Sequence, residues 1–199
     1  MDRHEWDERY RTRELVWTAE PNRFLVAEVA GLGPGRALDF AAGEGRNAVW
    51  LAGRGWRVTA VDYSEIGMAK ARELADARGV EVETVVADAT RPLPGAPQFD
   101  LVVVAYLQLP EPDRGAALRN AAAAVAPGGT LLVIAHDESN LEVGYGGPQD
   151  PRVLTSPAAV AAALDGFEVQ KAERVERVVE TADGPRVALD HVVRARRPA

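Results

Sequence analysis

The fold of this chain is decided by Ala37-Leu38-Asp39-Phe40-Ala41-Ala42-Gly43-Glu44-Gly45-Arg46-Asn47-Ala48. A short apolar run leads through two glycines straight into a helix-like sequence, which predicts a buried strand, a tight turn and a helix. Gly43 and Gly45 have no side chains to hold a ligand away from the main chain. The predicted helix presents unpaired N–H groups and the positive end of its dipole, so the turn favours a carboxylate or a phosphate.

The sequence on both sides of this turn alternates between strand and helix patterns. Strands are predicted at residues 36–42, 57–62, 83–87, 100–107 and 130–136, and helices within residues 21–30, 45–55, 64–79, 113–126 and 156–166. The uninterrupted apolar runs at residues 101–105 and 131–135 are typical of central parallel strands covered on both faces. The sequence therefore predicts an α/β fold with a doubly wound, mostly parallel sheet.

The end of the chain has a different pattern. Residues 167–180 and 186–194 are strand-like, and Ala182-Asp183-Gly184 between them is a strong signal for a β-hairpin. We expect the sheet to end in this antiparallel pair. The irregular segment at residues 143–148 is interpreted as a loop over the site.

The organisation predicted from these patterns is one domain over residues 1–199. It comprises an entry segment at residues 1–35, a ligand-binding core at residues 36–136, and a loop, helix and hairpin at residues 137–199. No internal repeat or long linker divides the chain.

Composition excludes several classes of protein. The chain has 199 residues, a formal charge of −7 and no cysteine. The negative charge opposes binding to a phosphate backbone, and the lack of cysteine excludes disulfides and thiolate metal sites. No run reaches the roughly 18 apolar residues that span a membrane, so we expect a cytoplasmic protein without a nucleic-acid or membrane partner. The composition leaves the oligomeric state open.

Two kinds of cofactor fit the glycine turn. Residues 43–48 match the G-x-G-x-x-A pattern of dinucleotide sites, and Asp62 follows about 20 residues on. S-adenosylmethionine is favoured by Asp39, because a carboxylate there suits an ammonium group and would repel a pyrophosphate. Asp62 can accept from ribose hydroxyls, Asp88 can accept from the adenine amine, and the amide of Ala89 can donate to an adenine ring nitrogen. These acids end consecutive strands, where ligands bind in open α/β folds.

These segments resemble the successive motifs of class I S-adenosylmethionine-dependent methyltransferases. The similar stretches are residues 39–45, 61–62, 87–89, 99–102 and 126–130, and the resemblance spans about residues 36–136. Within that family the chain looks most like the subgroup of tellurite-resistance and thiopurine methyltransferases. The resemblance implies a Rossmann-like, seven-stranded sheet with its last strand antiparallel, and a small-molecule methyl acceptor. S-adenosylhomocysteine would be the product of the cofactor.

The resemblance and the patterns together predict the site. Ala41 stands where the family has its first glycine, so a methyl group faces the methionine half of the cofactor. His136 is a candidate general base, Tyr106 a candidate for orienting the acceptor, and no metal site is expected. The entry segment is expected to form a helical lid. The predicted cofactor-binding residues are Tyr10, Trp17, Asp39, Ala41, Gly43, Gly45, Arg46, Asp62, Tyr63, Asp88, Ala89 and Ala105.

Two other functions remain open at this stage. A nicotinamide-dependent oxidoreductase would use the same glycine turn, although the roughly 90 residues after Asp100 leave little room for a separate substrate domain. A cofactor-binding protein without turnover would keep the same acids. The sequence does not rank oxygen, nitrogen, sulfur or oxyanion acceptors.

Overall fold

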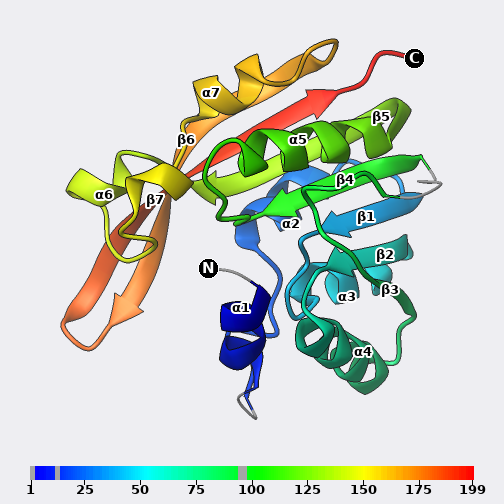
Figure 1. Cartoon of the computed structure of the whole chain (residues 1–199), viewed down its shortest axis with the longest axis horizontal. Helices are drawn as coiled ribbons and strands as arrows, with labels where there is room; N and C mark the ends of the chain where they lie inside the picture. The colour runs from blue at the N-terminus through cyan, green and yellow to red at the C-terminus, as the bar shows by residue number, and fades with distance from the viewer. Residues whose placement is uncertain (1–2, 12–13, 94–97) are drawn as a thin grey trace.

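The computed structural model describes residues 3–11, 14–93 and 98–199. Seven strands form one sheet in the order β3-β2-β1-β4-β5-β7-β6 (Figure 1). The strands are β1 (Arg36–Phe40), β2 (Arg57–Asp62), β3 (Val82–Val86), β4 (Phe99–Ala105), β5 (Val125–His136), β6 (Glu168–Thr181) and β7 (Gly184–Arg196). The first five strands pair in parallel, and β7 is antiparallel to both β5 and β6. The predicted fold class is therefore confirmed.

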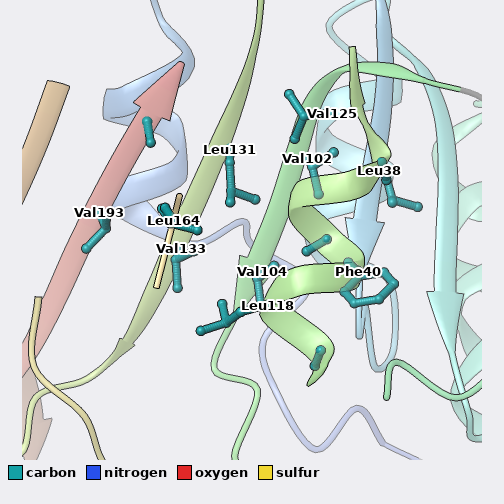
Figure 2. Packing of buried hydrophobic residues seen from close by; sticks show 14 of the residues in the cluster. Leu38, Phe40, Val102, Val104, Leu118, Val125, Leu131, Val133, Leu164 and Val193 are labelled. Carbon is teal, nitrogen blue, oxygen red and sulfur yellow. The ribbon is translucent and has the colours of Figure 1, made fainter. Parts of the chain in front are cut away.

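The helices cover both faces of the sheet. In chain order they are α1 (Arg3–Tyr10), α2 (Arg23–Val29), α3 (Arg46–Ala52), α4 (Glu65–Arg78), α5 (Asp113–Ala124), α6 (Asn140–Val143), the 3-10 helix η1 (Pro151–Val153) and α7 (Pro157–Ala162). One face packs against α2, α3 and α4, and the other packs against α5 and α7. Figure 2 shows the second face, where Leu118 of α5 joins the cluster formed by Phe40 and Val104 of the strands. Burial of apolar surface on two faces is what stabilises a parallel sheet.

Local signals place several element ends where they were predicted. The side chain of Ser64 accepts a hydrogen bond from the Gly67 amide at the start of α4, and Gly79 ends that helix in the left-handed conformation. Ser156 caps α7 in the same way, with Pro157 as its first residue.

One boundary differs from the prediction. We expected a helix over residues 113–126 and a strand from residue 130, but α5 ends at Ala124 and β5 begins at Val125. Gly128 and Gly129 exchange backbone hydrogen bonds with Arg197, so the strand ladder extends back through this glycine pair. Among the described residues, no helix combines the length and apolar character needed to cross a membrane.

The C-terminal hairpin is longer than the rest of the sheet. Residues 190–196 of β7 pair with β5, whereas residues 184–189 pair only with β6 and continue beyond His136. The two strands therefore project as an arm past the edge of the body (Figure 1). This arm starts at the carboxyl ends of the parallel strands, beside the predicted site.

Candidate functional site

A cavity of about 910 Å³ lies at the carboxyl ends of the parallel strands. Its volume falls in the range of small-ligand sites. It is lined by the entry segment, by the turns after β1 to β4, and by His136 and two residues of β6. The predicted site residues that line it are Tyr10, Trp17, Ala41, Gly43, Arg46, Asp62, Tyr63, Asp88, Ala89, Ala105, Tyr106 and His136.

Asp62 joins the glycine turn to the end of β2. Its carboxylate accepts hydrogen bonds of 2.9 Å from the amides of Gly43 and Ser64, one on each oxygen. The side chain is buried, and burial raises its pKa above the ordinary value for aspartate. Each carboxylate oxygen can accept a second hydrogen bond, so Asp62 can hold the turn and still receive a hydroxyl proton from a ligand.

The glycine turn is strained at the position where the family has a glycine. Ala41 has φ 64°, in the left-handed region that favours glycine, and Gly43 follows with φ 58°. A Cβ at Gly43 would lie 2.8 Å from the Tyr10 hydroxyl oxygen. Ala41 therefore adopts a conformation that favours glycine, at a steric cost, and Gly43 leaves the space that Tyr10 occupies.

Two predicted residues do not line the cavity. Asp39 is buried behind the turn, where its carboxylate accepts a 3.0 Å hydrogen bond from the Ala48 amide. A Cβ at Gly45 would lie 2.5 Å from the Cβ of Ala71 in α4, so this glycine allows α3 and α4 to pack closely. Both residues stabilise the turn on its side away from the cavity, and neither forms part of the cavity wall.

The turn after β3 presents a carboxylate at a more exposed position. Oδ1 of Asp88 accepts hydrogen bonds of 2.8 Å from the amide and the hydroxyl of Thr90. The carbonyl of Ala89 accepts from Asn120 of α5, which fixes this turn against the body. Oδ2 of Asp88 approaches Nε of Arg91 only at 3.8 Å, so it remains available to a ligand.

Glu44 anchors the entry segment, a role that the sequence analysis missed. Its buried carboxylate accepts hydrogen bonds from the amides of Val16 and Trp17, at 3.1 and 3.2 Å. Nζ of Lys70 donates to the same carboxylate at 2.9 Å and to the carbonyl of Glu14 at 2.8 Å. One ion pair from the glycine turn and α4 therefore fastens residues 14–17 beside the cavity.

The aromatic residues of the entry segment complete that wall. Trp6 and Tyr10 of α1 stack with ring centroids 5.4 Å apart, and the guanidinium of Arg9 lies 5.0 Å from the ring centroid of Trp17. Tyr10 is buried, and burial beside Asp62 raises the pKa of its hydroxyl above the ordinary value. The tyrosine is therefore a neutral group over the turn.

A second cluster lies at the other end of the cavity, around Asp190 of β7. This fully buried carboxylate accepts from Oη of Tyr106 and Nε of Arg177, each at 2.7 Å, and lies 2.9 Å from Nδ1 of His136. Tyr106 has φ 56°, another strained backbone position at the site. Asp190 itself does not line the cavity, but its three partners do. Sequence analysis missed Asp190 and Arg177 because neither belongs to a local motif.

One expectation about the cavity wall is corrected. The loop at residues 143–148 does not line the cavity; the Tyr145 amide donates to the Val187 carbonyl, so the loop lies on β7. Arg177 and Val178 of β6 take the place expected for it. Arg46 does line the cavity, and burial lowers the pKa of its guanidinium.

Comparison with known proteins gives evidence on the family of this chain that does not depend on the geometry of the cavity. Residues 37–129 match a family model described as a methyltransferase domain. A demethylmenaquinone methyltransferase of Thermus thermophilus is 38% identical over 104 residues, which are 51% of this chain and 47% of that protein. The chain spans about half the length of the curated relatives it matches.

Solved structures extend the similarity to the whole sheet. One, from work on the conversion of a disulfide bond into a thioacetal group during echinomycin biosynthesis, is 25% identical with a TM-score of 0.79 and covers 98% of this chain and 92% of that chain. The N-methyltransferase NodS from Bradyrhizobium japonicum, in complex with S-adenosylhomocysteine, is 19% identical with a TM-score of 0.74 and covers 99% and 98%. The hairpin and the entry segment are thus part of a shared fold.

Proposed function

Since residues 37–129 belong to the methyltransferase-domain family and the chain has the class I methyltransferase fold, we propose that this protein transfers a methyl group from S-adenosylmethionine to a small-molecule acceptor. The narrower subgroup of tellurite-resistance and thiopurine methyltransferases stays a prediction. The single domain was predicted above to consist of an entry segment, a core and a C-terminal part. In this proposal the cofactor binds in the core, at residues 36–136, and the acceptor binds beside the hairpin.

One observation carries the proposal. The turns after β1, β2 and β3 line a single cavity, and two of them bring a carboxylate to it, Asp62 and Asp88. The hydroxyl and amine donors of an adenosine match these acceptors, and the positively charged sulfonium and ammonium groups suit an acidic surrounding. These acceptors fit an adenosine, and the methyltransferase-domain match over residues 37–129 favours S-adenosylmethionine over a dinucleotide as the ligand that carries it.

We assign the residues of this end by their chemistry. Asp62 would accept from the ribose hydroxyls, and Asp88 with the amide of Ala89 would bind the adenine. Arg46 would pair with the methionine carboxylate, while Tyr10 and Trp17 cover the turn. Asp39 would act through the helix that it holds rather than by direct contact, which revises the role expected from sequence. The cofactor supplies an electrophilic methyl group on a sulfonium, so orientation of the acceptor provides much of the rate.

The acceptor would bind at the other end of the cavity. Leu107, Leu109, Pro110 and Val178 give this end an apolar wall, and Tyr106 and His136 add polar groups. This mixture supports a small, partly apolar acceptor, with Tyr106 orienting it and His136 as a candidate base. The net charge of −7 argues against a nucleic-acid substrate. The cytoplasmic location stays a prediction.

Calorimetric titration of the full chain with S-adenosylhomocysteine, S-adenosylmethionine and NAD tests the cofactor. We expect saturable binding of the two adenosyl ligands and none of NAD. A screen with methyl-labelled S-adenosylmethionine over phenols, thiols, amines and oxyanions then tests turnover. Binding of NAD alone would overturn the proposal, and cofactor binding without any labelled product would favour a binding protein without turnover.

A further inference from the structure

The Asp190 cluster has an architecture that binding of the cofactor does not require. A carboxylate without exposed surface is held by three side chains from three different strands or strand ends, and all three partners face the cavity. A buried charge is costly unless several donors compensate it. Its position therefore calls for an explanation in terms of the side chains that it orients.

We propose that Asp190 and Arg177 are positioning residues that set the basicity of His136, and that the methyl acceptor is a nucleophile that carries a proton, namely a hydroxyl or a thiol. The inference rests on the proposed methyl-transfer function and extends it to the chemical class of the acceptor. The nucleophile loses its proton to Nε2 of His136.

The hydrogen bond to Asp190 determines which nitrogen of His136 can accept a proton. Three donors outweigh the effect of burial and hold the pKa of Asp190 below its usual range, so this carboxylate is ionised and only accepts. A neutral His136 must then carry its proton on Nδ1, 2.9 Å from Asp190, which leaves the lone pair on Nε2.

The surroundings of the imidazole ring leave its Nε2 edge for the cavity. Nδ1 is bonded to Asp190, and a Cβ at Gly147 would lie 3.3 Å from both Nδ1 and Cε1 of His136. The backbone at Gly147 therefore covers that edge of the ring. Tyr106 lies against the ring face with centroids 4.7 Å apart. Because His136 lines the cavity, the edge that remains for a ligand is the one with Nε2.

The charge balance of the reaction explains why a base at this position is useful. The electron pair of the acceptor oxygen or sulfur forms the new bond to the methyl carbon, and the carbon–sulfur bond of the sulfonium breaks with its electrons going to sulfur. The O–H or S–H bond breaks, and the proton goes to Nε2 of His136. The positive charge thus moves from the sulfonium to the imidazolium, where the carboxylate of Asp190 stabilises it.

Arg177 acts in the opposite direction. Its guanidinium is 2.7 Å from Asp190 through Nε and offsets the carboxylate charge that would otherwise favour the imidazolium. The carboxylate of Asp190 stabilises a positive charge on the His136 ring, and the guanidinium of Arg177 offsets part of that stabilisation. The other titratable or charged groups around the ring are Tyr106 after β4, His191 of β7, Asp137 beside His136, and Arg46 of α3, which faces Tyr106 and Arg177.

Opposite shifts of the His136 pKa provide the test. The full chain contains three histidines, so NMR titration of the ring resonances is tractable, with His136→Gln to assign the signal. We expect Asp190→Asn and Arg177→Gln to move the pH midpoint of the His136 signal in opposite directions, downward in the first and upward in the second. Tyr106→Phe is the matched control, because it removes one hydrogen bond to Asp190 without changing a charge, and the pKa should move far less.

The outcomes separate a positioning role from a structural one. Loosened packing would move the pKa in the same direction in both charge variants, and that result, or no shift in either, would overturn the positioning role. Arg177 has a partly exposed side chain, so Arg177→Gln keeps the test available if Asp190→Asn fails to fold. The titration needs neither cofactor nor acceptor, so failure of S-adenosylhomocysteine to bind would be recognised separately as failure of the proposed function.

The acceptor class is tested with 2-naphthol, phenylmethanethiol and pyridine as probes, because the first two keep their proton at neutral pH. We expect methylated naphthol or thiol, with a rate that falls on the acid side and an acid limb that moves in opposite directions in Asp190→Asn and Arg177→Gln. Methylation of pyridine alone, or of neither protic probe by a chain that binds S-adenosylmethionine, would overturn this class of acceptor.

Discussion

At the scale of single residues, the backbone of the glycine turn is strained at Ala41. Ala41, with φ 64°, is expected to cost about 1–2 kcal/mol relative to a glycine in the same conformation. Replacement by glycine also gives the unfolded chain more freedom, which costs about 0.5–1 kcal/mol. Ala41→Gly should therefore raise the free energy of unfolding by up to about 1 kcal/mol, measured by urea denaturation.

Ala42→Gly is the control for this substitution, because Ala42 is not among the described non-glycine residues with positive φ. It should lower the free energy of unfolding by about 0.5–1 kcal/mol. Equal losses in the two variants would contradict strain at Ala41.

Replacement of Asp62 should have the most direct effect on the affinity for the cofactor. We expect Asp62→Ala to weaken binding of S-adenosylhomocysteine by about 10-fold or more, because both the proposed ribose contact and the hydrogen bond from the Gly43 amide would be lost. Calorimetry provides the measurement. Asp76→Ala, on the exposed side of α4, is the matched acidic control and should bind with the affinity of the unchanged chain. Unchanged affinity in Asp62→Ala would remove this residue from the site.

Asp39 makes stability depend on pH near neutrality. Burial raises its pKa to about 7, against the opposing hydrogen bond from Ala48 and the attraction of Arg46. The folded chain therefore keeps the proton to higher pH than the unfolded chain, and this stabilisation is lost as the pH rises through about 7. Asn does not ionise, so the free energy of unfolding of Asp39→Asn relative to the unchanged chain should rise between about pH 4 and pH 7 and level off at higher pH in urea titrations. A difference that stays constant with pH would contradict this assignment.

At the scale of elements, residues 14–17 of the entry segment are held by one ion pair between the glycine turn and α4. Glu44 and Lys70 hold the amides of Val16 and Trp17 and the carbonyl of Glu14. Lys70→Met leaves Glu44 buried without its cation, which is strongly destabilising locally. Hydrogen exchange at Val16 and Trp17 should therefore speed up by at least about 10-fold.

The control for Lys70→Met is the exposed ion pair between Arg3 and Glu65, which joins α1 to α4 at 2.8 Å. Exposed pairs contribute little, so Glu65→Gln should leave the exchange of Val16 and Trp17 near its original rate. Equal acceleration in both variants would show that the segment is held by α1 as a whole.

Element boundaries were predictable where the signal is local. Ser64 and Gly79 end α4 at both sides because a cap depends on backbone groups within a few residues. The start of β5 was missed because it depends on Arg197, far along the chain, which pairs with the glycines that usually end a helix. Local sequence does not contain that pairing.

The site residues also fall into those that the local sequence predicts and those whose contacts depend on distant parts of the chain. The acids at the strand ends were found because consecutive parallel strands bring them together by topology alone. Asp190 lies 54 positions from His136 and 84 from Tyr106, so their contact depends on strand register in the finished sheet. Asp39 and Gly45 have the right spacing but do not reach the cavity, because the Asp39 carboxylate turns to the Ala48 amide and the backbone of Gly45 packs against Ala71 of α4. Glu44 was missed because its contacts with the Val16 and Trp17 amides, 27 to 28 positions away, are not visible in the local sequence.

At the scale of the whole molecule, cofactor binding should stabilise the folded chain. A ligand at about 100 times its Kd adds roughly 2.7 kcal/mol, which raises the Tm of a chain of this size by about 5–11 °C. We expect this rise with S-adenosylhomocysteine in a thermal denaturation assay. NAD at the same concentration is the control and should leave the Tm unchanged; the reverse pattern would favour a nicotinamide enzyme.

The residues proposed to bind the cofactor and those near the acceptor end lie in different parts of the chain, and the projecting hairpin supplies the second group. Strand-end turns before residue 91 would hold the cofactor, whereas β6 and β7 supply Arg177, Val178 and Asp190 near the acceptor end. The methyltransferase-domain match ends at residue 129, before that strand pair begins. Because that strand pair lies outside the matched residues, we expect relatives that share the turns within residues 37–129 to differ most in the wall of the acceptor end, and therefore in the acceptor that they bind.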